Sequence, residues 1–353
     1  MAVLQAQNAI NRRVTLDSLD RRKFLIGAAT VSIPGCARDP NFDISGVRPG
    51  IPTRKVLVAS NRVEPTSDQS RVGRGDDVQL SMLELSTPTN RPFGELPDTE
   101  GNNFELVSET ELPKAQLGAT LREITPEDAQ REDPLMLWVH GFNNTPAEAI
   151  TRQVQIVEDV GHVGPAVSFV WPSAGSGSAY IHDRDSAIHA RAALTDLLKA
   201  LRQAWDKDIV LVAHSLGVFL ALEALIKLRG EIGDALLIDG ILMVQPDVAP
   251  DVFESQIMDA QPLPSNSVLI TSQGDRVLRL SAFLSSQRER VGSSSDADRY
   301  RALGLTVLDF TSIEDAGNSH IVLFSSPTVL RLLGDALSTG LRDTSAPPLP
   351  PPS

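Results

Sequence analysis

A chain of 353 residues with 41% hydrophobic and 22% charged residues has the composition of an ordinary globular protein, which excludes a largely disordered chain and a bundle of membrane spans. The formal net charge of −13 leaves no basic surface to neutralise phosphates, so we expect no nucleic-acid partner. The single cysteine, Cys36, excludes an intramolecular disulfide and a multi-cysteine metal site.

The first 35 residues predict an export signal. A basic segment that ends at Lys23 is followed directly by an apolar run from Phe24 to Ile33, which is too short to cross a bilayer. The string DRRKFL in this segment is similar to a twin-arginine signal. Cleavage nearby would release a periplasmic protein, whereas lipidation of Cys36 would attach the protein to a membrane, and the sequence leaves both outcomes open.

The rest of the chain is expected to form a Pro/Gly-rich linker, one α/β domain and a disordered proline-rich tail, at residues 36–53, 54–340 and 341–353. The segments 55–59 and 78–85 are rich in valine and leucine and predict strands. Prolines and glycines interrupt residues 86–133, where we expect antiparallel strands at one edge of the main sheet.

From Leu135 onward, short apolar runs alternate with segments of helical period, which predicts a mostly parallel sheet with helices on both faces. Thr145 to Glu148 contain the residues of a capping box, with proline at the first helical position. The predicted strands are residues 135–139, 166–170, 209–213, 238–244, 268–271 and 305–310.

The motif that indicates a reaction is the string IVLVAHSLG, in which an apolar strand ends at a turn with Ser215 at its apex. In a nucleophile elbow the serine backbone is strained, and residues two positions before and after the serine must be small. Gly217 meets this requirement, and Ala213 replaces the first glycine of the usual pattern. Ser215 is therefore the predicted nucleophile.

An elbow serine requires an acid and a histidine later in the chain, at the carboxyl ends of further strands. Asp275 follows the predicted strand 268–271, and His320 lies in the loop after the last one. We expect His320 to act as general base and Asp275 to orient its imidazole ring. Asp247 also follows a strand, but one strand too early, and is the second choice for the acid.

The predicted oxyanion hole comes from the loop that follows the strand at residues 135–139. A His140–Gly141 pair at this point allows a sharp turn, so that the backbone N–H groups of Phe142 and Leu216 can point at one oxygen atom. His182, Asp183 and Asp185 offer too few ligands for a metal site, and a loop that orders a helix start at Ser186 is the preferred interpretation. No metal and no cofactor are expected.

Five strings carry a resemblance to a known family. They are VLVASNR, VHGFNNTPAEA, FVWPSAGS, YIHDRDSA and VAHSLG, within a similarity that extends from Lys55 to about Leu337. The chain resembles the DUF900 group of bacterial α/β hydrolases. This resemblance implies the α/β-hydrolase fold and a hydrolase site with Ser215, Asp275 and His320 in the family's positions, but no defined substrate.

These observations predict a serine hydrolase that cleaves small carboxylic esters through an acyl-enzyme intermediate. Only a few residues separate the strand ending at Val244 from the next helix, so we expect no large cap domain. A thioesterase, an amidase or an acyltransferase would need the same triad and remains an alternative. A catalytically silent scaffold anchored to the membrane is the alternative from another class, and the oligomeric state stays unknown.

Overall fold

In a computed structural model of the chain, the structure describes residues 42, 50–64, 72–88, 91–96, 104–125, 133–273, 289–311 and 322–338. These residues form one nine-stranded sheet in the order β3-β2-β1-β5-β4-β6-β7-β8-β9. The strands are β1 (Thr53–Val63), β2 (Gly73–Ser86), β3 (Glu105–Glu111), β4 (Leu135–Val139), β5 (Ala166–Val170), β6 (Ile209–His214), β7 (Gly240–Val244), β8 (Asn266–Thr271) and β9 (Thr306–Asp309).

The sheet is parallel except at one edge. β1, β2 and β3 pair antiparallel, while β1 pairs parallel with β5 and so joins this edge to the six-stranded parallel part. From β5 through β4, β6, β7, β8 and β9 every neighbouring pair is parallel. Both the parallel sheet and the antiparallel edge strands predicted from the sequence are therefore confirmed.

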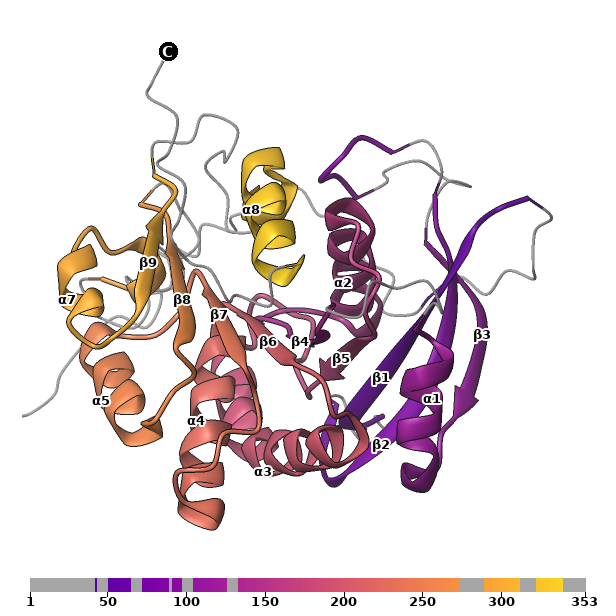
Figure 1. Cartoon of the computed structure of the whole chain (residues 1–353), viewed down its shortest axis with the longest axis horizontal. Helices are drawn as coiled ribbons and strands as arrows, with labels where there is room; N and C mark the ends of the chain where they lie inside the picture. Colours follow the sequence, from indigo (N-terminus) through magenta and orange to yellow (C-terminus); the bar gives the residue numbers. More distant parts are fainter. Residues whose placement is uncertain are drawn as a thin grey trace, which may run out of the picture. The chain divides into compact units, whose positions relative to one another are not determined.

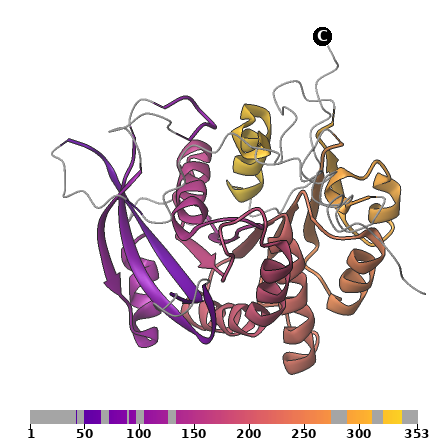
Figure 2. The ribbon, with the colours of Figure 1, turned by 180° about the vertical axis from the view of Figure 1, so that it is seen from behind.

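Helices cover both faces of the sheet (Figures 1 and 2). On one face lie α2 (Pro146–Val160) and α8 (Pro327–Ser338), which contact each other. On the other lie α1 (Leu117–Glu123), α3 (Tyr180–Ala204), α4 (Leu216–Ile232), α5 (Pro250–Ala260) and α7 (Ala297–Arg301). Short 3-10 turns add η1 (Lys114–Gln116), η2 (Val291–Ser293) and η4 (Val322–Ser325).

Strand periodicity divides the core into two layers. Along β4, Leu137 and Val139 face the layer of α3 and α4, whereas Met136 and Trp138 face the layer of α2 and α8. Because helices cover both faces, all five residues of β4 are buried, which is why this strand is a continuous apolar run in the sequence. Because β4, β5, β6, β7 and β8 are parallel, their carboxyl ends all lie at the same end of the strands.

The sequence did not predict every element. α1 lies in the stretch where proline and glycine blur the pattern, and its seven residues are too short to show a helical period. α3 begins at Tyr180, not at the expected Ser186.

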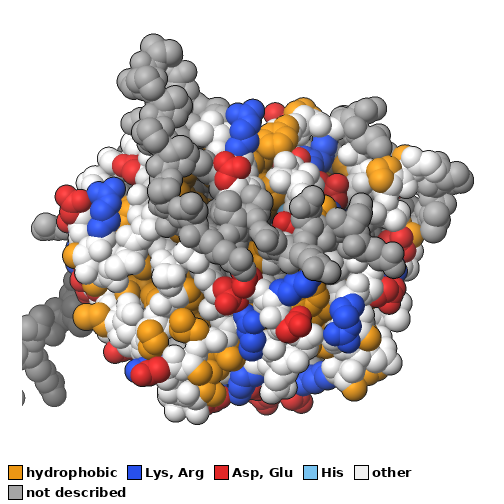
Figure 3. Space-filling model, viewed as in Figure 1, with side chains coloured by type: hydrophobic (Ala, Val, Ile, Leu, Met, Phe, Trp, Pro, Cys, Tyr) orange, Lys and Arg blue, Asp and Glu red, His pale blue; other side chains and the backbone are white. Residues whose placement is uncertain are grey.

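No helix in the described ranges is long and apolar enough to span a membrane. Charged side chains of both signs are interspersed over the face drawn in Figure 3.

Candidate active site

Ser215 stands at the turn between β6 and α4 in a strained backbone conformation. Its φ is 56° and its ψ is −123°, which is rare for any residue other than glycine. Its N–H donates to the carbonyl oxygen of Val244 on the neighbouring strand (3.0 Å), and the residue is 3% exposed. This geometry is the strand-turn-helix elbow predicted from the sequence, with the serine at its apex.

Two glycines allow the elbow to lie against the HGFNN loop (residues 140–144). A Cβ atom on Gly141 would lie 2.9 Å from the Cβ of Ser215. A Cβ on Gly217 would lie 2.4 Å from the carbonyl oxygen of His140 and 2.5 Å from that of Val139. Both contacts are shorter than real carbon contacts, so only glycine fits at either position.

His140 orients the peptide that carries the Phe142 N–H group. Its Nδ1 lies 2.9 Å from the carbonyl oxygen of Gly141, and its ring stacks on Trp171, whose indole N–H donates to the His140 carbonyl (2.8 Å). Burial lowers the pKa of His140 to about 3, so the ring is neutral at pH 7. Since a carbonyl oxygen only accepts, the single ring proton is assigned to Nδ1.

The two residues whose backbone N–H groups are expected to form an oxyanion hole lie close to Ser215 in the chain or in space. Phe142 follows Gly141, which is in contact with the serine, and Leu216 is the first residue of α4. A helix leaves the first backbone N–H groups without an intrahelical acceptor, and the helix dipole adds partial positive charge there. The arrangement suits an oxygen that acquires negative charge close to Ser215.

A buried ion pair lies at the carboxyl end of β7, the strand next to β6 in the sheet. Arg290 Nε lies 3.1 Å from Asp247 Oδ1, and the two side chains are 4% and 5% exposed. The N–H groups of Val291 and Gly292 donate to the carbonyls of Val248 and Pro246. Backbone hydrogen bonds therefore also join the two segments that carry the ion pair. Asp247, the second choice for the acid, therefore has an arginine as its charged partner.

The predicted triad partners Asp275 and His320 lie outside the described residues, as do Cys36 and the export signal. Two residues after His320, the chain is described again at η4, where Phe324 packs edge-on against Trp138 and His214. The nearest described residue before Asp275 is Gln273. Of the predicted site, the structure thus brings together Ser215, the loop at His140 to Phe142, and the small residues around them.

Sequence reasoning missed the side chains that support the HGFNN loop, namely Trp171, Ser173 and Asp183. One signal was available in the period of α3, where residues 183, 186, 187 and 190 are all buried. A carboxylate on this otherwise small and apolar stripe needs partners in the protein interior. In the structure Asp183 contacts two loops, which is a different role from ordering a helix start at Ser186.

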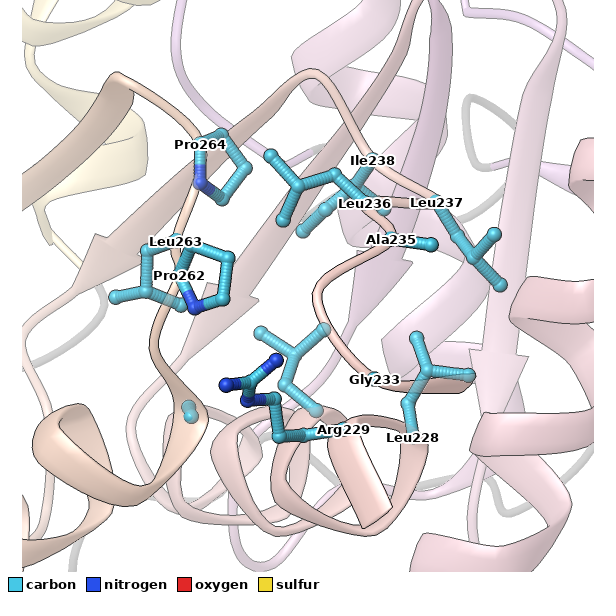
Figure 4. Close-up of a pocket in the computed structure, with 12 residues that line it drawn as sticks. Leu228, Arg229, Gly233, Ala235, Leu236, Leu237, Ile238, Pro262, Leu263 and Pro264 are labelled. Carbon is cyan, nitrogen blue, oxygen red and sulfur yellow. The ribbon is translucent and has the colours of Figure 1, made fainter. Parts of the chain in front are cut away.

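Within the described ranges, no group of three or more histidine, cysteine, aspartate or glutamate side chains is placed to hold a metal ion. A small cavity lies between the end of α4 and the loops that lead into β7 and β8 (Figure 4). It is at the amino ends of these strands, on the opposite edge of the sheet from Ser215. Its volume of about 20 Å³ is close to the room that one water molecule needs, so it does not suit a substrate.

The comparisons with known proteins agree with this geometry at the level of the family. The family described as an alpha/beta hydrolase of unknown function (DUF900) matches residues 118–336. No curated protein sequence matches the chain. Many solved structures do resemble its fold at low identity.

Three of these solved structures illustrate the level of similarity. The α/β serine hydrolase without a lid XC6422 from Xanthomonas campestris is 15% identical, covering 62% of this chain and 85% of that one, with a TM-score of 0.37. The carboxylesterase EstE1 from a metagenomic library is 14% identical (84% and 92%, TM-score 0.40), and a thermostable esterase from Pseudomonas putida is 12% identical (85% and 86%, TM-score 0.40). Similarity at this level does not indicate a substrate.

Proposed function

This chain belongs to the DUF900 family of α/β hydrolases, and we propose that it is a serine hydrolase that cleaves carboxylic esters with Ser215 as nucleophile. The observation that carries the proposal is the backbone of Ser215, strained at φ 56° and interlocked with the HGFNN loop through Gly141 and Gly217. Strain of this kind persists only where the surrounding structure enforces it, and it is concentrated at functional sites.

In the proposed reaction, the Ser215 hydroxyl oxygen attacks the ester carbonyl carbon while His320 takes the hydroxyl proton. The carbonyl oxygen becomes an oxyanion, which the N–H groups of Phe142 and Leu216 bind. Collapse of this intermediate breaks the bond to the alcohol, which leaves with the proton from His320, and Asp275 holds the imidazole throughout. Water then releases the acid from the acyl-enzyme by the same steps.

The experiment that tests the nucleophile is labelling of the folded protein with a fluorophosphonate, followed by peptide mapping. We expect one adduct, on Ser215, that is absent in Ser215→Ala and strongly slowed in His320→Ala. Ser255→Ala, which removes an exposed serine of α5, is the matched control and should label like the wild type. A folded wild type without any adduct would overturn the proposal in favour of a catalytically silent scaffold.

The bond that is cleaved needs a separate measurement, because thioesters, amides and acyl transfer to an alcohol use the same machinery. Matched ester, thioester and amide donors of one acyl group should show the highest kcat/KM for the ester. With a competing alcohol added, hydrolysis to the free acid should remain the main fate of the acyl-enzyme. A higher kcat/KM for the thioester or amide, or transfer to the alcohol in excess of hydrolysis, would replace the esterase assignment with that activity.

We also propose that the protein is exported by the twin-arginine route, on the basis of the string DRRKFL before an apolar run. Replacement of Arg21 and Arg22 by lysine should retain the full chain in the cytoplasm. If Cys36 is lipidated, the exported protein will incorporate labelled fatty acid and lose it in Cys36→Ser. Export that is unaffected by the arginine replacements would contradict the assigned route.

A further inference from the structure

Asp183 is a fully buried carboxylate on the first turn of α3 that the proposed reaction does not use. Its Oδ2 accepts hydrogen bonds from the Asn143 N–H (3.0 Å) and the Ser173 hydroxyl (2.7 Å). Its Oδ1 accepts from the Ala174 N–H (2.7 Å) and lies 3.2 Å from Nδ1 of His182. A buried carboxylate is costly unless such donors surround it, so its position is tied to theirs.

The donors come from two loops. Asn143 belongs to the HGFNN loop after β4, and Ser173 and Ala174 belong to the loop after β5. The Ser173 hydroxyl also accepts from the Asn144 N–H (3.1 Å), so it connects a second residue of the HGFNN loop to the carboxylate. Asn143 has a φ of 60°, which costs energy in a residue with a side chain, and the bond from its N–H to Asp183 favours this conformation.

Arg62 of β1 also contacts the loop after β5. Its guanidinium donates to the Ser173 carbonyl (2.7 Å). Burial lowers the pKa of Arg62, and attraction to Glu64 and to Asp183 opposes this shift. The charge of Arg62 therefore lies where it stabilises the buried carboxylate.

We infer that Asp183 is a positioning residue that sets the orientation of the Phe142 N–H in the oxyanion hole, an inference that rests on the proposed function. The Asn143 N–H belongs to the peptide that directly follows Phe142, and Asp183 fixes that peptide from its N–H side. On the other side of the same peptide, Asn144 Nδ2 donates to the Phe142 carbonyl oxygen (2.8 Å). Asp183 does not cap its own helix, since the N-cap of α3 is Ala179 and the backbone N–H groups that Asp183 accepts from belong to the two loops.

The test compares Asp183→Asn with the wild type. Each carboxylate oxygen takes one backbone N–H, so an amide must set its own NH₂ against one of them, whichever way it is turned. We expect kcat for p-nitrophenyl butyrate and the rate of fluorophosphonate labelling to fall about 10- to 100-fold, with KM changed less than about threefold. Affinity for an alkyl trifluoromethyl ketone, whose adduct carries an oxyanion, should fall in parallel with kcat.

Asp185→Asn, an exposed aspartate on the same helix, is the control and should match the wild type in all three measurements. Ser173→Ala removes the hydroxyl that donates to Asp183 and accepts from Asn144, but leaves both backbone N–H bonds to the carboxylate. It should lower kcat about fivefold with KM unchanged, which keeps the test open if Asp183→Asn does not fold. Equal losses in affinity for substrate and for the ketone, or wild-type rates in both variants, would overturn the inference while the proposed function stands. Absence of Ser215 labelling in the wild type would overturn both.

Discussion

Ser215 lies between two buried carboxylates, one bonded directly by N–H groups of two loops and the other bonded directly by an arginine. On the side of β4 and β5, Asp183 is surrounded by two backbone N–H groups, a hydroxyl and a histidine ring nitrogen. On the side of β7 and β8, Asp247 is paired with the Arg290 guanidinium. Backbone donors can neutralise a carboxylate only when loops are folded around it, so Asp183 orders the backbone beside the nucleophile. An arginine brings its own charge, so Asp247 joins two segments through their side chains.

The largest effect that distinguishes the two sides is expected from Asp247→Asn. The substitution leaves the buried Arg290 guanidinium without its carboxylate, which typically costs about 3–5 kcal/mol in the free energy of unfolding. Chemical denaturation of the variant measures this loss. If the role of Asp247 is structural, the double variant Asp247→Leu, Arg290→Met should recover most of the stability together with the labelling rate of Ser215.

This double variant also tests the second choice for the triad acid. Recovery of stability without recovery of ester turnover would assign the acid role to Asp247 and remove it from Asp275. Asp275→Asn is the parallel measurement, and we expect it to abolish most of the activity with little change in unfolding. Together the two measurements distinguish a carboxylate that stabilises the fold from one that orients His320.

The side of β4 and β5 should also be sensitive to acid, because it contains two buried neutral histidines. Burial lowers the pKa of His140 to about 3 and that of His162 to about 4. In the unfolded chain both histidines bind protons below about pH 6.5. Their contribution to stability is therefore complete above that pH and is lost as the pH falls toward 4 and 3, by about 2 kcal/mol for each at pH 5.

Urea unfolding between pH 8 and pH 4 measures this effect. His162→Gln should make the decline below pH 6.5 less steep, because the proton that His162 binds only in the unfolded chain is removed from the balance. Above pH 7 the pH dependence of the variant and the wild type should coincide. An unchanged slope below pH 6.5 would mean that His162 is protonated, or accessible, in the folded protein.

The contrast between these residues explains what the sequence could predict. The strands of the parallel part, the elbow and the capping box at Thr145 depend on short-range patterns, and the structure contains each of them. The role of Asp183 depends on contacts among three segments that are distant in the sequence. The helix α1 depends on packing, because seven residues are too few to show a helical period. Sequence spacing carries no information on which donors surround a buried charge. The acid and base proposed at Asp275 and His320 stay predictions.

Gly217→Ala should disturb the close packing of the elbow, which lies between the side of β4 and β5 and the side of β7 and β8. The added methyl would overlap the carbonyl oxygens of His140 and Val139, so we expect a loss of about 1–3 kcal/mol in stability and a much slower labelling of Ser215. Gly230→Ala, on the same helix, is the matched control, because a Cβ there meets nothing within 4 Å. Higher helix propensity should stabilise that variant by about 0.5–1 kcal/mol and leave labelling unchanged. Equal behaviour of the two variants would show that the close approach at Gly217 is not required.

The smallest effect is expected at the end of the HGFNN loop, where Thr145 caps α2. Its hydroxyl accepts from the Glu148 N–H (3.2 Å), and the Glu148 carboxylate accepts from the Thr145 N–H (2.9 Å). Thr145→Ala should cost about 1 kcal/mol in the free energy of unfolding, and Thr145→Ser should restore it. Asp296→Ala removes the N-cap of α7, which is remote from the HGFNN loop, and serves as a comparison. If the cap also steadies the loop, Thr145→Ala will slow Ser215 labelling severalfold while Asp296→Ala will not, whereas equal rates would limit Thr145 to the stability of its helix.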